Sequence, residues 1–257
     1  MDLLFGDTNE ENKEQAIDSL IKDSTPKPAF FFLVVLSVLM ATLGLLINSA
    51  SVIIGSMLIA PILSPILSMG LGLTLGDTKL ISRSGTTLIK SLIYSVALST
   101  LATWLLWGVI GGGELLLSYN PEILARTQPS IIYLFIAIIA GLATAFARMK
   151  PELNETLPGT AIAVALVPPI ATIGIGIATW NLNVISGALS MFIINAIGII
   201  VASMAMFSLM NIYSKKKIAE QSLKNADKEQ EQIAEKVEKD RKERESSELS
   251  ESKNTHS

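Results

Sequence analysis

Long apolar runs, separated by short polar segments, fill the chain between residues 29 and 213. Each run has about 20 residues, the length that an α-helix needs to cross the hydrocarbon core of a bilayer. The runs lack the polar face that a helix on the surface of a soluble domain presents. The pattern therefore predicts transmembrane helices over residues 29–47, 50–75, 85–110, 129–147, 158–179 and 184–212.

Both ends of the chain are polar and frame this six-span membrane domain of residues 29–213. Residues 1–28 form a short soluble segment with a predicted helix that ends near Asp23, and they lack the apolar core of a signal peptide. One face of that helix carries Ala16, Ile17, Leu20 and Ile21. Residues 214–257 form a charged cytoplasmic tail, which we expect to be helical at first and disordered beyond about Arg244.

Prolines interrupt two of the predicted spans near their middle: Pro61 and Pro65 in the second, Pro168 and Pro169 in the fifth. A proline inside a helix removes one backbone donor and clashes with the preceding turn, so the helix kinks or breaks. Because the freed carbonyl groups cannot face lipid, both breaks should lie inside the bundle, against protein or trapped water. Taken singly, each proline also fits a simple kink between packed helices.

The six spans divide into two similar sets of three, each with a proline-broken helix in second place. Overlaying the two breaks pairs Pro61 with Pro169 and Ser64 with Thr172. Three spans per set would make the second set enter the membrane in the opposite direction. The predicted fold is therefore an all-α transmembrane fold of six spans, arranged as two inverted three-helix repeats with proline-broken second and fifth helices. Broken helices at matching positions are typical of transporter binding sites near the bilayer midplane.

The groups available for binding inside the predicted membrane domain are neutral. They comprise hydroxyls, one amide and the backbone groups freed at the breaks, and the candidate substrate-binding residues are Ser56, Pro61, Ser64, Pro65, Ser68, Pro168, Pro169, Thr172 and Asn195. Such groups suit a small neutral or zwitterionic solute, an alkali cation held by carbonyls, or an anion at a half-helix N-terminus. The residues do not choose among these three.

Small residues at fourfold spacing indicate close helix contacts rather than chemistry. Examples are Gly72 with Gly76, Gly141 with Ala145, and Gly198 with Ala202. A stripe of Ser91, Ser95, Ser99 and Thr103 suits a tight helix contact or, less well, a polar path.

Composition excludes several classes of chemistry. The chain has no cysteine, and its one histidine, His256, lies in the tail. No Asp or Glu lies within the core of a predicted span, which disfavours proton coupling through a membrane carboxylate. The chain shows neither a nucleophile with its base nor a phosphate loop, so we expect no enzyme activity, catalytic residue, cofactor or metal. The expected partners are the bilayer, a small solute or ion and further copies of the chain, without nucleic acid.

Basic residues predict the orientation. With the N-terminus in the cytoplasm, the inner loops carry Lys79, Arg83, Arg148, Lys150 and the lysines 215–217, whereas the outer connections carry only Arg126. This asymmetry follows the positive-inside rule. We therefore expect a multi-pass protein of the cell (inner) membrane with both termini cytoplasmic.

Three sequence blocks resemble a known family. They are NSASVIIGSMLIAPILSPI (residues 48–66), PGTAIAVALVPPIATIGIGIA (residues 158–178) and GALSMFIINAIGII (residues 187–200). The first two resemble the signature blocks of the bacterial and archaeal domain of unknown function 389 family, also called the uncharacterised hydrophobic domain, and the third resembles its last block. The resemblance implies a polytopic membrane protein and leaves the activity open.

The sequence therefore leaves two alternative functions. The first is a transporter or channel-like protein for a small solute or ion, which would bind at the broken helices. The alternative is a non-transporting membrane scaffold or sensor that recruits a cytosolic partner through its charged tail.

Overall fold

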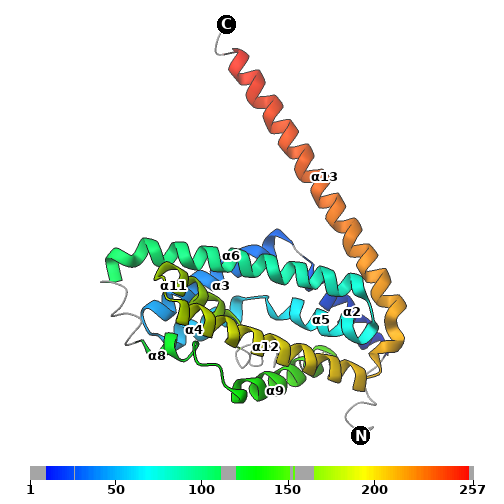
Figure 1. Ribbon diagram of the computed structural model, residues 1–257. Helices are drawn as coiled ribbons and strands as arrows, with labels where there is room; N and C mark the ends of the chain where they lie inside the picture. The colour runs from blue at the N-terminus through cyan, green and yellow to red at the C-terminus, as the bar shows by residue number, and fades with distance from the viewer. Residues whose placement is uncertain (1–9, 26, 111–119, 151–152, 154–164, 255–257) are drawn as a thin grey trace.

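The computed structural model describes residues 10–25, 27–110, 120–150, 153 and 165–254, and every regular element within them is helical (Figure 1). The principal elements are α2 (Glu10–Ser24), α3 (Pro28–Leu46), α4 (Ala50–Ile59), α5 (Leu63–Leu75), α6 (Thr78–Ile110), α8 (Pro121–Leu124), α9 (Ile131–Arg148), α11 (Val167–Ala178), α12 (Leu182–Leu209), the 3₁₀ helix η2 (Ile212–Lys215) and α13 (Lys216–Asn254).

Four of the described helices, α3, α6, α9 and α12, are long and apolar enough to cross a membrane. Helices α4 and α5 make a fifth candidate, bent by 53° at the break between them. Helix α11 is apolar but has only 12 residues. Residues 158–164, the first part of the predicted fifth span, lie outside the described residues. The all-helical prediction is confirmed, as is a cluster of apolar helices suited to a membrane.

Three turns of the described chain share one geometry, and we call them the tight corners, at residues 44–53, 72–81 and 176–185. In each, the residue two positions before the next helix has a left-handed backbone: Asn48 (φ 55°), Gly76 (φ 61°) and Trp180 (φ 54°). The following N–H groups close the corner by donating to a glycine carbonyl: Ser49 to Gly44 at 2.8 Å, Asp77 to Gly72 at 2.9 Å and Asn181 to Gly176 at 2.9 Å. Each corner therefore fixes an antiparallel helix pair through local bonds.

The glycine of each tight corner is required by the close approach of the next helix. A Cβ atom on Gly44, Gly72 or Gly176 would lie 2.8 to 2.9 Å from the Cγ1 atom of the isoleucine nine positions later. In the second and third corners, the residue after the left-handed one also caps the helix that follows, through its side chain. Asp77 Oδ1 accepts from Lys79 N, and Asn181 Oδ1 accepts from Asn183 N. The cap explains why α6 begins at Thr78, seven residues before the predicted span.

The helix pairs pack reciprocally: α5 lies against α12, and α11 lies against α6. At both crossings a glycine meets a serine. A Cβ on Gly70 would meet Ser203 of α12, and a Cβ on Gly174 would lie 2.5 Å from the Cβ of Ser99 on α6. Gly141 likewise meets Ala202 between α9 and α12, which confirms the close packing expected of the small residues.

Helices α2 and α13 pack against each other at one end of the bundle, and α2 also packs against α5. The buried face of α2 is the predicted apolar face, with Ile17, Leu20 and Ile21 fully buried. Ion pairs join α13 to the bundle at Arg83–Asp227 and Lys27–Glu229, and Lys215 of η2 pairs with Glu14 of α2.

Beyond these contacts α13 projects away from the bundle as one helix (Figure 1). Its side chains are exposed from Glu231 to Lys239. The helix continues to Asn254, past the position near Arg244 where the sequence predicts disorder. Residues with high helix propensity and pairs such as Lys242–Glu238, at 2.7 Å, explain helix formation without an apolar face.

Candidate functional site

The break between α4 and α5 follows from Pro61. Helix α4 ends at Ile59, and Ala60 adopts an extended backbone (φ −73°, ψ 121°), as expected for the residue before a proline. Helix α5 begins at Leu63 with no side-chain cap, so its first N–H groups receive no support from a hydroxyl or carboxylate. The break therefore presents the carbonyl end of one half-helix and the amide end of the next.

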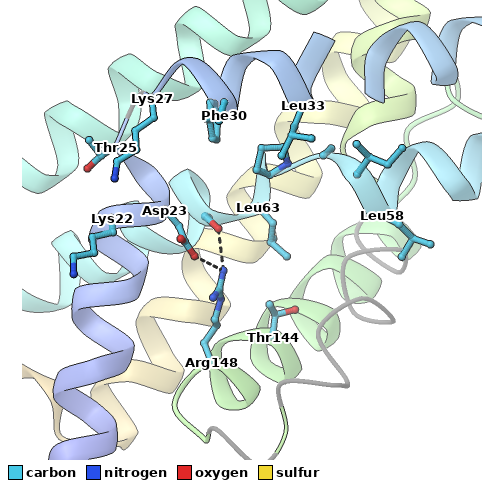
Figure 2. Close-up of a pocket in the computed structure, with 15 residues that line it drawn as sticks. Lys22, Asp23, Thr25, Lys27, Phe30, Leu33, Leu58, Leu63, Thr144 and Arg148 are labelled. Carbon is cyan, nitrogen blue, oxygen red and sulfur yellow. Dashed lines mark hydrogen bonds and ion pairs between the residues drawn. The ribbon is translucent and has the colours of Figure 1, made fainter. Parts of the chain in front are cut away.

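A cavity of about 590 Å³ opens beside this break (Figure 2). Its walls come from the end of α2, the start of α3, the α4–α5 break and the end of α9. The lining residues that carry polar groups are Lys22, Asp23, Thr25, Lys27, Ser64, Thr144 and Arg148. We call this space the break cavity.

Arg148 joins three elements at the break cavity. It is the last residue of α9, where a cation is favoured by the helix dipole. Its Nη2 atom donates to Ser64 Oγ at 3.0 Å and to Asp23 Oδ2 at 3.0 Å, as the dashed lines in Figure 2 show. The arginine side chain is 22% exposed, so the Asp23–Arg148 pair is only partly screened by solvent. This contact ties α2 and α9 to the first turn of α5.

Two lysines add positive charge to the cavity wall. Lys22 pairs with Asp18 at 2.7 Å, and the hydrogen bond to Asp18 raises the pKa of Lys22. Lys27 pairs with Glu229 of α13 at 2.9 Å, and the hydrogen bond from Lys27 lowers the pKa of the Glu229 carboxyl. Three cations and one carboxylate, Asp23, therefore line the break cavity.

Two of the nine candidate residues line the break cavity, namely Pro61 and Ser64. Ser56 is buried in α4 and donates to Ile53 O at 2.6 Å. Pro65 is buried in the first turn of α5, and Ser68, one turn later, donates to Leu20 O of α2 at 2.9 Å. These three belong to the packing around the break.

The remaining candidates belong to the second half of the chain. Pro168 and Pro169 are buried in the first turn of α11, and the hydroxyl of Thr172 donates to Pro168 O at 2.9 Å within that helix. Asn195 is buried in α12. None of the four lines the break cavity.

The serine and threonine stripe of α6 makes a helix contact, as expected. Ser99 donates to Ala171 O of α11 at 2.8 Å, and Thr42 of α3 donates to Ser99 at 2.9 Å. The hydroxyl of Ser95 is buried and has no partner among the described residues.

Sequence reasoning missed Asp23 and Arg148 as site residues. Arg148 was visible only as a basic residue after a span, and Asp23 as the end of a soluble helix. The two lie 125 positions apart, and no spacing rule links them. Among the described residues, no group of three or more His, Asp or Glu side chains could hold a metal ion.

Comparison with known proteins gives a family but no activity. The profile of the family described as "Domain of unknown function (DUF389)" matches residues 57–201. The chain is also 32% identical over 181 residues to "Uncharacterized protein MJ0678" of Methanocaldococcus jannaschii, over 70% of this chain and 53% of that protein. The chain thus spans about half the length of this curated relative. No solved structure matches the chain.

Proposed function

This chain belongs to the domain of unknown function 389 family, and we propose that it is a transporter or channel-like protein for a small solute or ion. The observation that carries the proposal is the break cavity: a space of about 590 Å³, lined by apolar residues and by several charged and polar ones, at a break in an otherwise apolar helix. Irregular backbone within a membrane domain is tolerated where it lines a cavity. Such breaks supply the binding groups of many secondary transporters. The proposal includes no chemical step and no enzyme activity.

The proposed architecture is six spans in two inverted repeats, α3 to α6 and residues 131–209. Its support is one constant offset. Gly70 and Gly174, Gly72 and Gly176, Asp77 and Asn181, and Ser99 and Ser203 are each 104 positions apart. Each pair plays the same part, either in a tight corner or in the reciprocal crossings of α5 with α12 and α11 with α6.

This offset differs by one helical turn from the sequence overlay. It pairs Pro65 with Pro169 and Ser68 with Thr172. The overlay paired Pro61 with the second proline of the Pro168–Pro169 motif, whereas the packing contacts follow the glycines. We adopt the glycine register because it relates two pairs of equivalent contacts, the corner bonds and the helix crossings.

The proposed location is the cell membrane, with both termini in the cytoplasm. The terminal helices α2 and α13 lie at one end of the bundle, and Lys27, Arg83, Arg148 and Lys215 form their ion pairs at that end. A cluster of basic residues on one side agrees with the positive-inside rule.

Cysteine labelling tests whether the break cavity is open to water. The chain has no cysteine, so a single introduced thiol is labelled without background. In membrane vesicles, we expect Ser64→Cys to react with an impermeant maleimide about tenfold faster than Ser68→Cys, because only accessible thiolates react. Ser68 is the matched control, one turn later on the same helix: Ser64 is 6% exposed and lines the cavity, whereas Ser68 is fully buried against α2. Equal rates at the two positions would sink the cavity as a solute site.

Flux measurement uses the same variant. Proteoliposomes are loaded in turn with labelled anions, cations and neutral solutes, and efflux is compared before and after maleimide treatment. Labelling should stop flux through Ser64→Cys and leave the cysteine-free wild type unchanged. Flux of no solute through the wild-type protein would overturn the transport proposal.

The alternative, a scaffold or sensor, is favoured by one observation: the exposed, projecting part of α13. A truncation after Gln232 removes that part and keeps the ion pairs of Lys215, Asp227 and Glu229. A scaffold should lose its function in this variant, whereas a transporter should keep its flux.

A further inference from the structure

We propose that the break cavity binds a small soluble oxyanion, such as a carboxylate, bicarbonate or phosphate, with Arg148 as its principal ligand. The inference rests on the proposed function only in taking this anion as the transported solute. Binding itself needs only the cavity described above.

The hydrogen bonds of the Arg148 guanidinium to described residues involve one of its three nitrogen atoms. Both of its hydrogen bonds to described residues, to Ser64 and to Asp23, come from Nη2. The Nε and Nη1 groups donate to no described residue, and the side chain lies in the cavity wall. Arginine presents its donors as a planar fork that matches the two oxygens of a carboxylate or phosphate. The arrangement is therefore half of an arginine–oxyanion pair.

Helix α5 supports the same charge. It has 13 residues and begins at the cavity, with Leu63 and Ser64 in the lining. The amide end of a helix favours an anion because of its partial positive charge. In this first turn Ser64 N donates to Pro61 O at 3.3 Å and Pro65 has no N–H, so the support comes mainly from the helix dipole. No side chain caps this end. Ser64 also brings a hydroxyl that already accepts from Arg148, so its own proton is available to a ligand oxygen.

The charge in the wall argues against the two other solute classes left open by the sequence. The carbonyl end of α4 would suit an alkali cation, but Lys22, Lys27 and Arg148 line the same cavity, each paired with a carboxylate. A neutral solute would make less use of the Arg148 guanidinium than an oxyanion would. An oxyanion uses both the cations and the amide end of α5.

Asp23 occupies the place that we assign to the ligand. Its carboxylate, 3.0 Å from Arg148, is chemically a tethered oxyanion. A soluble oxyanion must therefore share or displace this contact, which loosens α2 from α9. The geometry thus predicts that removing the Asp23 charge strengthens anion binding.

The test measures the thermal stability of the full chain in maltoside detergent, where no lipid phosphate competes. Sodium acetate, bicarbonate and phosphate are titrated at constant ionic strength against sodium chloride. A ligand of the folded state raises stability with the logarithm of its concentration over its dissociation constant. We expect at least one oxyanion to stabilise the wild type saturably.

Four variants define the site. Arg148→Gln should weaken oxyanion binding about tenfold or more, as expected for loss of a charge-assisted pair. Arg148→Lys should fall between it and the wild type, because a lysine keeps the charge and loses the fork. Asp23→Asn should tighten binding several-fold. Arg126→Gln is the matched control: Arg126 also pairs with a carboxylate at 3.0 Å and is 20% exposed, but it does not line the cavity.

Opposite shifts in Arg148→Gln and Asp23→Asn support the inference, and a general loss of folding cannot produce them. Stabilisation by no oxyanion, or an equal loss in Arg126→Gln, would overturn it. The two proposals fail separately. A saturable oxyanion response without flux keeps the site and ends the transport proposal. Flux of a cation or neutral solute, without an oxyanion response, keeps transport and ends this inference.

Discussion

The α4–α5 break and the first turn of α11 have much in common, but among the described residues the charged cavity lies at the α4–α5 break. Each contains prolines, each starts a helix that ends in a tight corner, and each of those helices crosses a partner through a glycine–serine contact. At α5 the first turn faces Arg148, whereas residues 167–176 of α11 are all buried and none is charged. The two segments therefore have similar backbones but different neighbouring side chains.

The difference comes from the charged side chains that pack against the first break. Lys22 and Asp23 belong to α2, Lys27 immediately precedes α3, and Arg148 ends α9. The cavity is thus made by what packs against the break rather than by the prolines. The proposed binding site therefore belongs to the α4–α5 break, and the described part of α11 packs within the bundle.

The largest expected effect concerns the two crossings. In Gly174→Ala the new Cβ would lie 2.5 Å from Ser99 Cβ and 2.9 Å from the Thr100 backbone nitrogen, so helices α11 and α6 must separate. Overpacking of this kind costs about 1–3 kcal/mol. Gly70→Ala should cost less, because its nearest neighbour is the rotatable hydroxyl of Ser203. Denaturant or thermal unfolding in detergent checks the order, and an equal loss would contradict it.

The next largest effect on stability is expected at the tight corners. Trp180 holds a left-handed backbone (φ 54°) that favours glycine, and its side chain is 90% exposed. Trp180→Gly should therefore stabilise the protein by about 1 kcal/mol. The converse change, Gly76→Ala, should destabilise it by about 1 kcal/mol, since φ is 61° there. Melting temperatures of both variants test the pair; shifts of the same sign would contradict it.

A pair of hydroxyl deletions, one at the α4–α5 break and one in α11, should have a smaller effect but tests the comparison most directly. Ser64→Ala should weaken the oxyanion response about threefold, typical of one lost hydrogen bond. Thr172→Val should leave that response unchanged, because its hydroxyl bonds Pro168 O inside α11. Titration of both variants with the same anion decides. A loss in Thr172→Val would place the second break in the site.

The smallest effect concerns pH. The hydrogen bond from Lys27 lowers the pKa of Glu229, so the stabilisation from this pair is complete above the ordinary carboxyl pKa. It is lost as the pH falls through the lowered value. The difference in melting temperature between wild type and Glu229→Gln should therefore hold from neutral to mildly acidic pH and disappear at lower pH. Glu238→Gln, whose partner is on the same helix, is the control.

Hydropathy predicts the described apolar helices well, because each is apolar over nearly its whole length. Pro61 likewise predicts the break between Ile59 and Leu63. The break cavity escapes such reasoning, since its charge comes from α2 and α9, far away in sequence. Gly72 shows a related limit: its spacing to Gly76 predicts a close helix contact, which Gly72 makes with Ile81 of α6, but the spacing does not say which helix is met or that Gly76 instead forms the left-handed turn. Local spacing cannot tell these cases apart.

The tight corners also bear on how the chain enters the membrane during synthesis. Only three residues separate α3 from α4 and α11 from α12, and only two separate α5 from α6. The hydrogen bonds that close each corner lie within the same ten residues. The two helices of a pair should therefore insert together rather than one after the other. We expect each pair to leave the insertion machinery as a closed hairpin. Glycosylation mapping of a Gly72→Leu variant tests this, because a hairpin that cannot close should leave α5 and α6 outside the bilayer together.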